Sequence, residues 1–213
     1  MTYPSTNNLI KLPSPSRLKD LMQALAALDA VISPEWEYRY FSFNSRWDDG
    51  EMMGSRRNVS GDEMFVLFND AGVFIKGFDH ERWDENLKSD YFYDSVPPEF
   101  ASGTTEPAFS PNLVTFCCWR STMSDHWDFA RVHQILTVDD GSSEMMSELD
   151  DDPASYLSFA RDYYEEEFDV RSVAAIYRHT PMTLALATSL NSATDYPTLI
   201  RDLSEIGYPI GTD

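Results

Sequence analysis

The chain has 213 residues, of which 42% are hydrophobic and 14% aromatic, so it can bury a sizeable core. Its 36 acidic residues outnumber its 16 Lys and Arg residues, and the resulting net charge of −20 disfavours binding to nucleic acid phosphates or to anionic membranes. The charge instead suits a protein that binds a basic protein or that imitates nucleic acid, with carboxylates that steer the encounter.

Cysteine content and hydropathy indicate the compartment. The two cysteines, Cys117 and Cys118, are adjacent, and an extended backbone points neighbouring side chains to opposite faces, so they cannot close a useful disulfide loop. The sequence also lacks a signal-peptide pattern and an apolar run of about 18 residues. These features predict a cytoplasmic protein without a membrane-spanning segment.

The N-terminal region is predicted to be an arm followed by a helix. Residues 1–13 mix Pro, Ser, Thr and Asn without periodicity, which predicts a loose arm. In the helix that follows, Ser14 is the expected N-cap and Pro15 the first residue. Apolar residues recur there at spacings of three and four and form one stripe that can cover a sheet: Leu18, Leu21, Leu25, Leu28 and Ile32.

The middle of the chain has the pattern of an antiparallel sheet. Residues 35–43 alternate aromatic and polar side chains and predict a half-buried strand, with residues 51–58 as its hairpin partner. The stretch EMFVLFNDAGVFIKGF predicts a second hairpin, closed by a turn with Gly72 in the left-handed conformation. A third pair of strands is predicted in LVTFCCWR and HWDFARV.

Helix signals replace strand signals from residue 142 onward. Proline at or near a first helical position marks three predicted starts: Asp152–Pro153, Thr180–Pro181 and Tyr196–Pro197. Asp169 is expected to cap a further helix, and Gly207 to end the last one.

The predicted fold class is therefore α+β, with an N-terminal helix, a central antiparallel β-sheet and a C-terminal helical layer. We expect a single domain over residues 14–213. Within it, the helical part, residues 139–213, is expected to pack on the helix and sheet of residues 14–138.

Well-known catalytic motifs are absent from the sequence. It contains no GxGxxG, GxxxxGKS/T, HExxH, GxSxG or CxxC pattern, so these routes to nucleotide binding, zinc proteolysis and serine hydrolysis have no support. We therefore predict no cofactor and no metal. Lys76 lies between Phe74 and Phe78 on one strand face, which predicts a stem packed on apolar surface rather than a catalytic amine.

The stretch IKGFDHERWDE is the most site-like in the sequence. Asp79, His80 and Glu81 follow a predicted strand, and such groups can build a metal or acid/base site if they converge. In the structural alternative, Asp79 caps a short helix and Glu81 lies in its first turn, where the helix dipole favours an anion. His126 and Asp128 share one predicted strand face, but a catalytic metal site usually needs a third ligand, so an exposed polar pair is favoured there.

One segment resembles a known family. The stretch SGDEMFVLFNDAGVFIKGFDHE, residues 60–81, is similar to the core of a family of uncharacterised bacterial proteins. The segments DFARVH, RDYYEEEFD and EIGYP resemble that family more loosely. The resemblance implies a bacterial, cytoplasmic source and no particular activity, and it adds interest to the segment from Lys76 to Glu81.

Acidic residues are concentrated in residues 139–169. This segment has twelve acidic residues and one Arg, a net charge of −11. A calcium loop that starts at Asp150 is excluded, because Ala154 falls on the third ligand position and Ser155 stands where the loop needs Gly. The run Asp150–Asp152 instead suits the N-terminal end of a helix.

The run Glu165–Glu167 is harder to explain from the helix alone. It lies near the predicted C-terminus of that helix, where the dipole penalises each anion by about 0.3–1 kcal/mol. Pairing of Glu167 with Arg171 can offset part of this cost. Solubility and contact with a partner both remain open as reasons for the run.

These observations support three functional hypotheses. The leading one is a non-enzymatic, acidic bacterial protein that binds a basic protein partner through Glu165, Glu166 and Glu167, with a toxin-neutralising immunity protein as one concrete form. The alternative is a metal-assisted or acid/base enzyme that uses the Asp79–Glu81 cluster, with His126 as a further candidate residue. The third is a structural or regulatory subunit without a site of its own.

Overall fold

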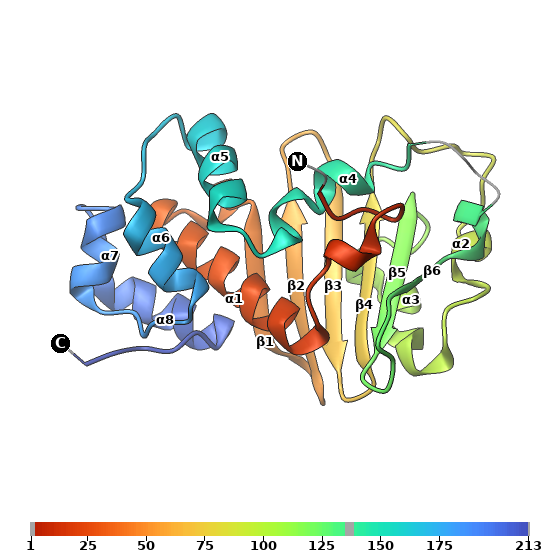
Figure 1. Ribbon diagram of the computed structural model, residues 1–213, viewed down its shortest axis with the longest axis horizontal. Coiled ribbons are helices and arrows are strands. Elements are labelled where there is room, and N and C mark those ends of the chain that lie inside the picture. Colours follow the sequence, from red (N-terminus) through yellow and green to blue (C-terminus); the bar gives the residue numbers. More distant parts are fainter. Residues whose placement is uncertain (1–2, 135–138, 213) are drawn as a thin grey trace.

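The computed structural model describes residues 3–134 and 139–212, and its architecture confirms the predicted α+β class (Figure 1). Six antiparallel strands follow one another along the sheet in chain order. They are β1 (Phe41–Asp48), β2 (Glu51–Arg57), β3 (Glu63–Asn69), β4 (Gly72–Phe78), β5 (Phe116–Ser121) and β6 (Asp128–Phe129).

The helices lie at both ends of the chain and in the β4–β5 connection. They are α1 (Pro15–Ile32), α2 (Asp90–Tyr93), α3 (Ala101–Thr105), α4 (Ser142–Met145), α5 (Pro153–Tyr164), α6 (Val170–Tyr177), α7 (Leu184–Leu190) and α8 (Tyr196–Ile206). Short 3₁₀ turns occur at Leu9–Lys11, Trp36–Tyr38, Pro98–Phe100, Pro107–Phe109, Arg131–Gln134 and Ser147–Asp150.

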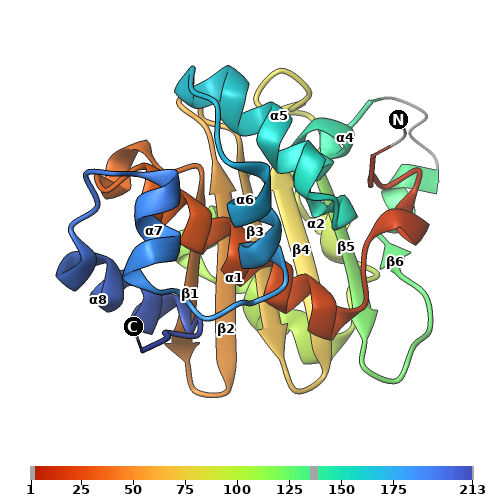
Figure 2. The same cartoon turned by 60° about the vertical axis from the view of Figure 1, so that its left-hand side comes forward.

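Helix α1 is the centre of the larger core. Its N-terminus is capped as predicted, because the Ser14 hydroxyl accepts a hydrogen bond from the backbone N–H of Arg17. Figure 2 shows α1 between the sheet and the C-terminal helices. Every residue from Leu21 to Val31 is consequently buried, so α1 packs on two sides rather than along the single predicted stripe.

The opposite face of the sheet is covered by the β4–β5 connection. Phe92, Phe100 and Phe109 from this connection pack on strand residues such as Phe65 and Phe74 in a second core. Lys76 is fully buried beside this core, and its ammonium group donates hydrogen bonds to the backbone carbonyls of Phe109 and Ser110. Burial lowers the pKa of Lys76 to about 8. Lys76 therefore anchors the connection, with its charged end buried as well as its stem.

The entry to the sheet differs from the prediction. Trp36–Tyr38 forms a 3₁₀ turn in which Trp36 and Tyr38 are exposed, and β1 begins only at Phe41. The reason is a long-range contact, because Asp29 of α1 accepts the backbone N–H groups of Tyr40 and Phe41, both at 2.8 Å. This contact fixes where the chain turns from the helix into the strand.

The β3–β4 hairpin has the predicted strands and a different role for its glycine. The two central turn residues are Asp70 and Ala71, and Gly72 is the first residue of β4, paired with Asn69. Its φ is +149°, and a Cβ at this position would lie 2.1 Å from the Arg120 carbonyl oxygen of β5. Glycine is required here both by the positive φ and by the close approach of the neighbouring strand.

The N-terminal segment also differs from the loose arm that was predicted. Leu9 and Leu12 are buried in the larger core. Thr6 donates a hydrogen bond from its backbone N–H to the Ser142 hydroxyl and one from its own hydroxyl to Asp140. These contacts tie the described part of the arm to the segment around α4.

Most of the predicted helix signals are confirmed. Asp152 and Asp169 cap α5 and α6 with their side chains, and Gly207 ends α8 with φ +74°. The start predicted at Thr180–Pro181 is wrong, because the chain there forms a β-bridge between Met182 and Ile210 and the next helix begins at Leu184.

The buried carboxyl group of Asp29 joins three parts of the fold. Besides the two N–H groups of β1, it accepts a hydrogen bond of 2.8 Å from the Tyr156 hydroxyl of α5. Burial raises the pKa of Asp29 from 3.8 to about 6, and the hydrogen bonds from Phe41, Tyr156 and Tyr40 limit that rise.

We expect Asp29 to give the stability of the protein a specific dependence on pH. The folded-state pKa is raised, so the Asp29 contribution to the free energy of unfolding is greatest below pH 3.8 and is lost as the pH rises through about 6. The free energy of unfolding of the wild type, minus that of Asp29→Asn, should therefore decrease by about 2–3 kcal/mol as the pH rises from 3.8 to above 6. Urea denaturation at a series of pH values measures it, and a difference independent of pH would contradict the assignment.

Candidate functional site

The structure places the predicted Asp79–Glu81 cluster in a turn that follows β4. The Asp79 carboxylate accepts the backbone N–H groups of Glu81 at 2.9 Å and Arg82 at 3.3 Å. Asp79 therefore caps a turn, as in the structural alternative, although no helix follows. Glu81 does not join a site, because its side chain is 68% exposed and pairs with Arg82.

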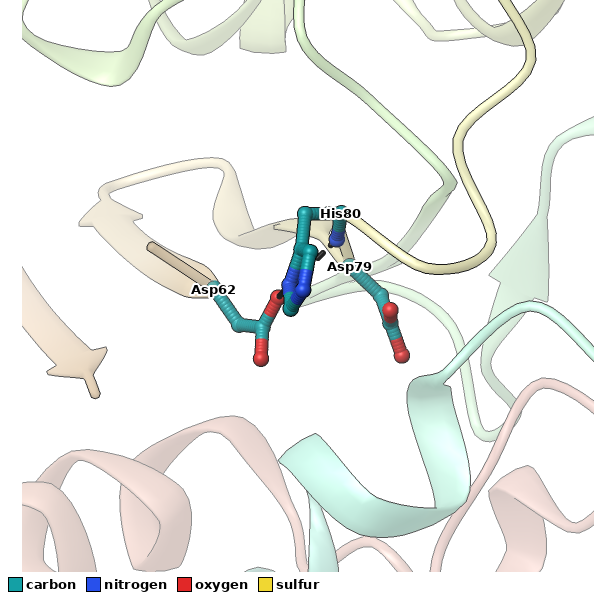
Figure 3. Close-up of side chains that lie close together, drawn as sticks. All are labelled: Asp62, Asp79 and His80. Carbon is teal, nitrogen blue, oxygen red and sulfur yellow. Dashed lines mark hydrogen bonds and ion pairs between the residues drawn. The ribbon is translucent and has the colours of Figure 1, made fainter. Parts of the chain in front are cut away.

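His80 is instead held by Asp62, a residue that the sequence analysis did not select. One Asp62 carboxylate oxygen lies 2.6 Å from Nδ1 of His80 and 2.9 Å from its backbone nitrogen (Figure 3). The hydrogen bond with Asp62 raises the pKa of His80. The two residues are 18 positions apart and flank the β3–β4 hairpin, in which Glu63 pairs with Phe78, so this hairpin brings them together.

The cluster has the donor types of a small metal site. One ligand atom each from Asp62, Asp79 and His80 lie within 4.8 Å of one another. Both carboxylates already accept hydrogen bonds, however, and His80 Nδ1 is bonded to Asp62. A metal ion at this place would have to compete with those bonds or use the remaining Nε2 and carboxylate oxygens.

The second predicted pair is an exposed surface feature. His126 lies 2.9 Å from Asp125 and 3.6 Å from Asp128, and its side chain is 68% exposed. The ion-pair geometry agrees with the favoured interpretation as an exposed polar pair.

A large groove beside α5 was not predicted. Its volume is about 1010 Å³, and its walls come from the N-terminal segment, the start of the sheet, the α4–α5 region and α5 itself. The lining residues are Tyr3, Ser5, Asn7, Asn8, Tyr40, Arg56, Ser143, Glu144, Ser147, Glu148, Ser155, Ser158, Phe159, Asp162 and Tyr163. All of them are polar or aromatic, and none is aliphatic.

A buried ion pair lies among these lining residues. Arg56 of β2 and Glu148 are each only 5% exposed, and Arg56 Nε lies 3.5 Å from Glu148 Oε2. Neither of these two atoms has a hydrogen-bond partner in the described part of the chain. Burial raises the pKa of Glu148, and the positive charge of Arg56 opposes this shift. Such an incompletely bonded buried pair costs desolvation energy and needs an explanation.

An aromatic cluster forms another part of the groove. The rings of Phe159 and Tyr163, one turn apart on α5, are stacked with centroids 5.6 Å apart, and each lies 4.7 Å from the ring of Tyr40. The Arg56 guanidinium lies over the Tyr40 ring at 5.0 Å. Cationic and aromatic groups are therefore already in contact within the groove.

The fold uses most of the acidic residues of segment 139–169. Eight of the twelve accept a hydrogen bond or form an ion pair: Asp139, Asp140, Glu148, Asp150, Asp151, Asp152, Glu167 and Asp169. Across residues 3–134 and 139–212, the carboxylates of the other four make neither contact: Glu144, Asp162, Glu165 and Glu166. All four are exposed, and Glu144 and Asp162 line the groove.

The predicted partner-binding run lies directly after α5. Glu165 ends the helix in the left-handed conformation, with φ +57°, and Glu165, Glu166 and Glu167 are all exposed. Glu167 pairs with Arg161 at 2.7 Å, so the predicted pairing with Arg171 is wrong. The left-handed turn at Glu165 directs the chain back toward α5, which brings Glu167 to Arg161.

Comparisons with known proteins add no function. No protein-family model, curated protein or solved structure matches this chain. The resemblance to a bacterial family thus remains an expectation from residues 60–81 and the three looser segments. Among the described residues, no helix has the length and hydrophobicity that crossing a bilayer requires.

We expect the Asp62–His80 contact to be visible in the titration of His80. Replacing Asp62 with Asn removes the negative charge, so the pKa of His80 should fall toward its ordinary value of 6.5. Nuclear magnetic resonance of the imidazole protons measures this shift. His126 provides an internal control, because its pKa is raised by Asp125 and should not change. An unchanged His80 pKa would contradict the geometry.

Proposed function

We propose that this chain is a non-enzymatic protein that binds a basic protein partner through the acidic end of α5. The supporting observation is the position of the four carboxylates of residues 139–169 that make no hydrogen bond or ion pair in the described part of the chain. Three of the four, Asp162, Glu165 and Glu166, lie within five residues of one another, and the fourth, Glu144, lines the same groove as Asp162. Exposed carboxylates of this kind attract and orient a basic surface.

Local folding energetics support a role beyond solubility. Anions near the C-terminus of a helix are penalised by the dipole, and a left-handed conformation is unfavourable for a residue such as Glu165 by about 1–2 kcal/mol. Any exposed position without these costs would serve solubility equally well in a chain whose net charge is already −20. Binding of a partner whose basic groups pair with these carboxylates accounts for their concentration at the end of α5. A toxin-neutralising immunity protein is one concrete form of this proposal.

We expect the chain to capture a basic protein from a lysate of its source cell in a manner that high salt reverses. Substitution of Glu165, Glu166 and Glu167 with Gln should reduce the amount captured on the order of tenfold, because charge–charge steering is lost. Quantitative mass spectrometry identifies the captured protein and its charge.

A variant with the same change in net charge provides the control. Asp70→Asn, Glu85→Gln and Glu99→Gln neutralise three exposed carboxylates outside the groove and the α5 end, and this variant should capture the partner as the wild type does. Equal losses in the two variants would mean that only overall charge matters. Capture of no basic protein would contradict the proposal.

Metal-assisted or acid/base catalysis is a second candidate function, favoured by the convergence of Asp62, Asp79 and His80 within 4.8 Å. Elemental analysis of the purified protein tests it, together with the effect of added Zn²⁺ or Mn²⁺ on the His80 resonances. An unperturbed His80 spectrum and no bound metal would remove this candidate.

A further inference from the structure

We infer that the groove beside α5 is a binding site for an arginine side chain of the basic partner. The inference rests on the proposed function and specifies its chemistry. It starts from the buried, incompletely bonded Arg56 and Glu148 side chains, which line the groove together with the unpaired carboxylates of Glu144 and Asp162.

Arg56 itself demonstrates the recognition that we propose. Its guanidinium lies over the Tyr40 ring at 5.0 Å, and its Nε lies 3.5 Å from the Glu148 carboxylate. A planar cation is thus held between an aromatic face and a carboxylate, which is the combination that suits arginine better than lysine.

Other lining residues of the groove provide the same two kinds of group. Phe159 and Tyr163 offer stacked rings, and Asp162 and Glu144 offer carboxylates without an ion-pair partner in the described chain. Arg56 is the single basic residue among the described lining residues, and it faces Glu148. A second guanidinium can therefore use aromatic and acidic groups that Arg56 does not already occupy.

The charge of the lining selects among possible occupants. One basic and three acidic side chains line the groove, so a cation is favoured and a phosphate or other anion is repelled. The stacked rings favour a planar, weakly hydrated cation over a compact, strongly hydrated one. Ser and Asn side chains from the N-terminal segment and from α5 can accept hydrogen bonds from the remaining guanidinium N–H groups.

Titration with a tetra-arginine peptide, followed by calorimetry at low ionic strength, tests this inference. Tetra-citrulline is the matched neutral peptide, since it keeps the shape of the side chain and lacks the charge. We expect tetra-arginine to bind more tightly than tetra-lysine and tetra-citrulline to show no binding. Binding of tetra-citrulline, or equal binding of tetra-arginine and tetra-lysine, would overturn the inference.

Two double variants locate the binding site. Glu144→Gln with Asp162→Asn removes the two unpaired carboxylates of the groove and should weaken tetra-arginine binding on the order of tenfold, as expected for the loss of charge-assisted hydrogen bonds. Asp70→Asn with Glu85→Gln makes the same change in charge away from the groove and should leave the affinity within about twofold. Equal weakening in both variants would contradict a localised site. The thermal midpoint of each variant reports whether it is folded.

The two proposals fail separately. If the lysate experiment captures a basic partner and the groove double variant still captures it fully, the groove inference is wrong and the partner binds at Glu165–Glu167. If tetra-arginine binds in the groove and no basic partner is captured, the groove recognises a guanidinium that belongs to another kind of molecule, and the proposed function is wrong.

Discussion

The structure depends on a carboxyl group in the last turn of its central helix. Asp29 is fully buried in α1, and it accepts hydrogen bonds from two backbone N–H groups at the start of β1 and from the Tyr156 hydroxyl of α5. The end of α1, the start of β1 and α5, whose Tyr156 is 127 positions from Asp29, are thereby held at one point. The hydrogen bonds of Asp29 hold Tyr40 at the start of the sheet and Tyr156 in α5. Phe159 lies one turn beyond Tyr156, so the same hydrogen bonds position the rings of Tyr40 and Phe159 in the groove. Burial of a carboxyl group costs desolvation free energy, and the three hydrogen-bond donors offset part of this cost.

The acidic segment 139–169 has two roles once its contacts are known. Four of its twelve carboxylates join this segment to the rest of the fold: Asp139 contacts Arg82, Asp140 contacts Thr6, Glu148 contacts Arg56, and Asp151 contacts Arg17. Asp152 and Asp169 satisfy helix N-termini. Charge density in the sequence therefore overstates how much acidity is available to a partner. Within this segment, the available part is the group of four unpaired carboxylates at the groove and at the end of α5.

Features that depend on near neighbours could be predicted from the sequence. The N-caps at Ser14, Asp152 and Asp169 and the β3–β4 hairpin follow from local steric and hydrogen-bonding rules, and each is present. The fold class followed from the order of these elements. The strand predicted from residue 35 was wrong in its first half because alternation of aromatic residues does not reveal that Asp29 binds the chain at Tyr40.

The site could not be predicted because its residues meet only through the tertiary fold. Arg56 and Glu148 are 92 positions apart, and neither residue lies in a recognisable sequence motif. Asp62 and His80, by contrast, flank the predicted β3–β4 hairpin, so the pairing of Glu63 with Phe78 could have indicated their contact. One signal was available in part: the run EEE at the end of α5 lacked a folding reason, and the unpaired carboxylates Glu165 and Glu166 lie there.

A crystal structure of the chain in complex with tetra-arginine is the most direct measurement of the central claim. That claim is that the fold assembles aromatic rings and unpaired carboxylates into one site for a guanidinium. The predicted result is a guanidinium stacked on Phe159 or Tyr163, with the carboxylate of Asp162 or Glu144 within hydrogen-bonding distance. A peptide bound elsewhere, with the groove residues uncontacted, would contradict the account.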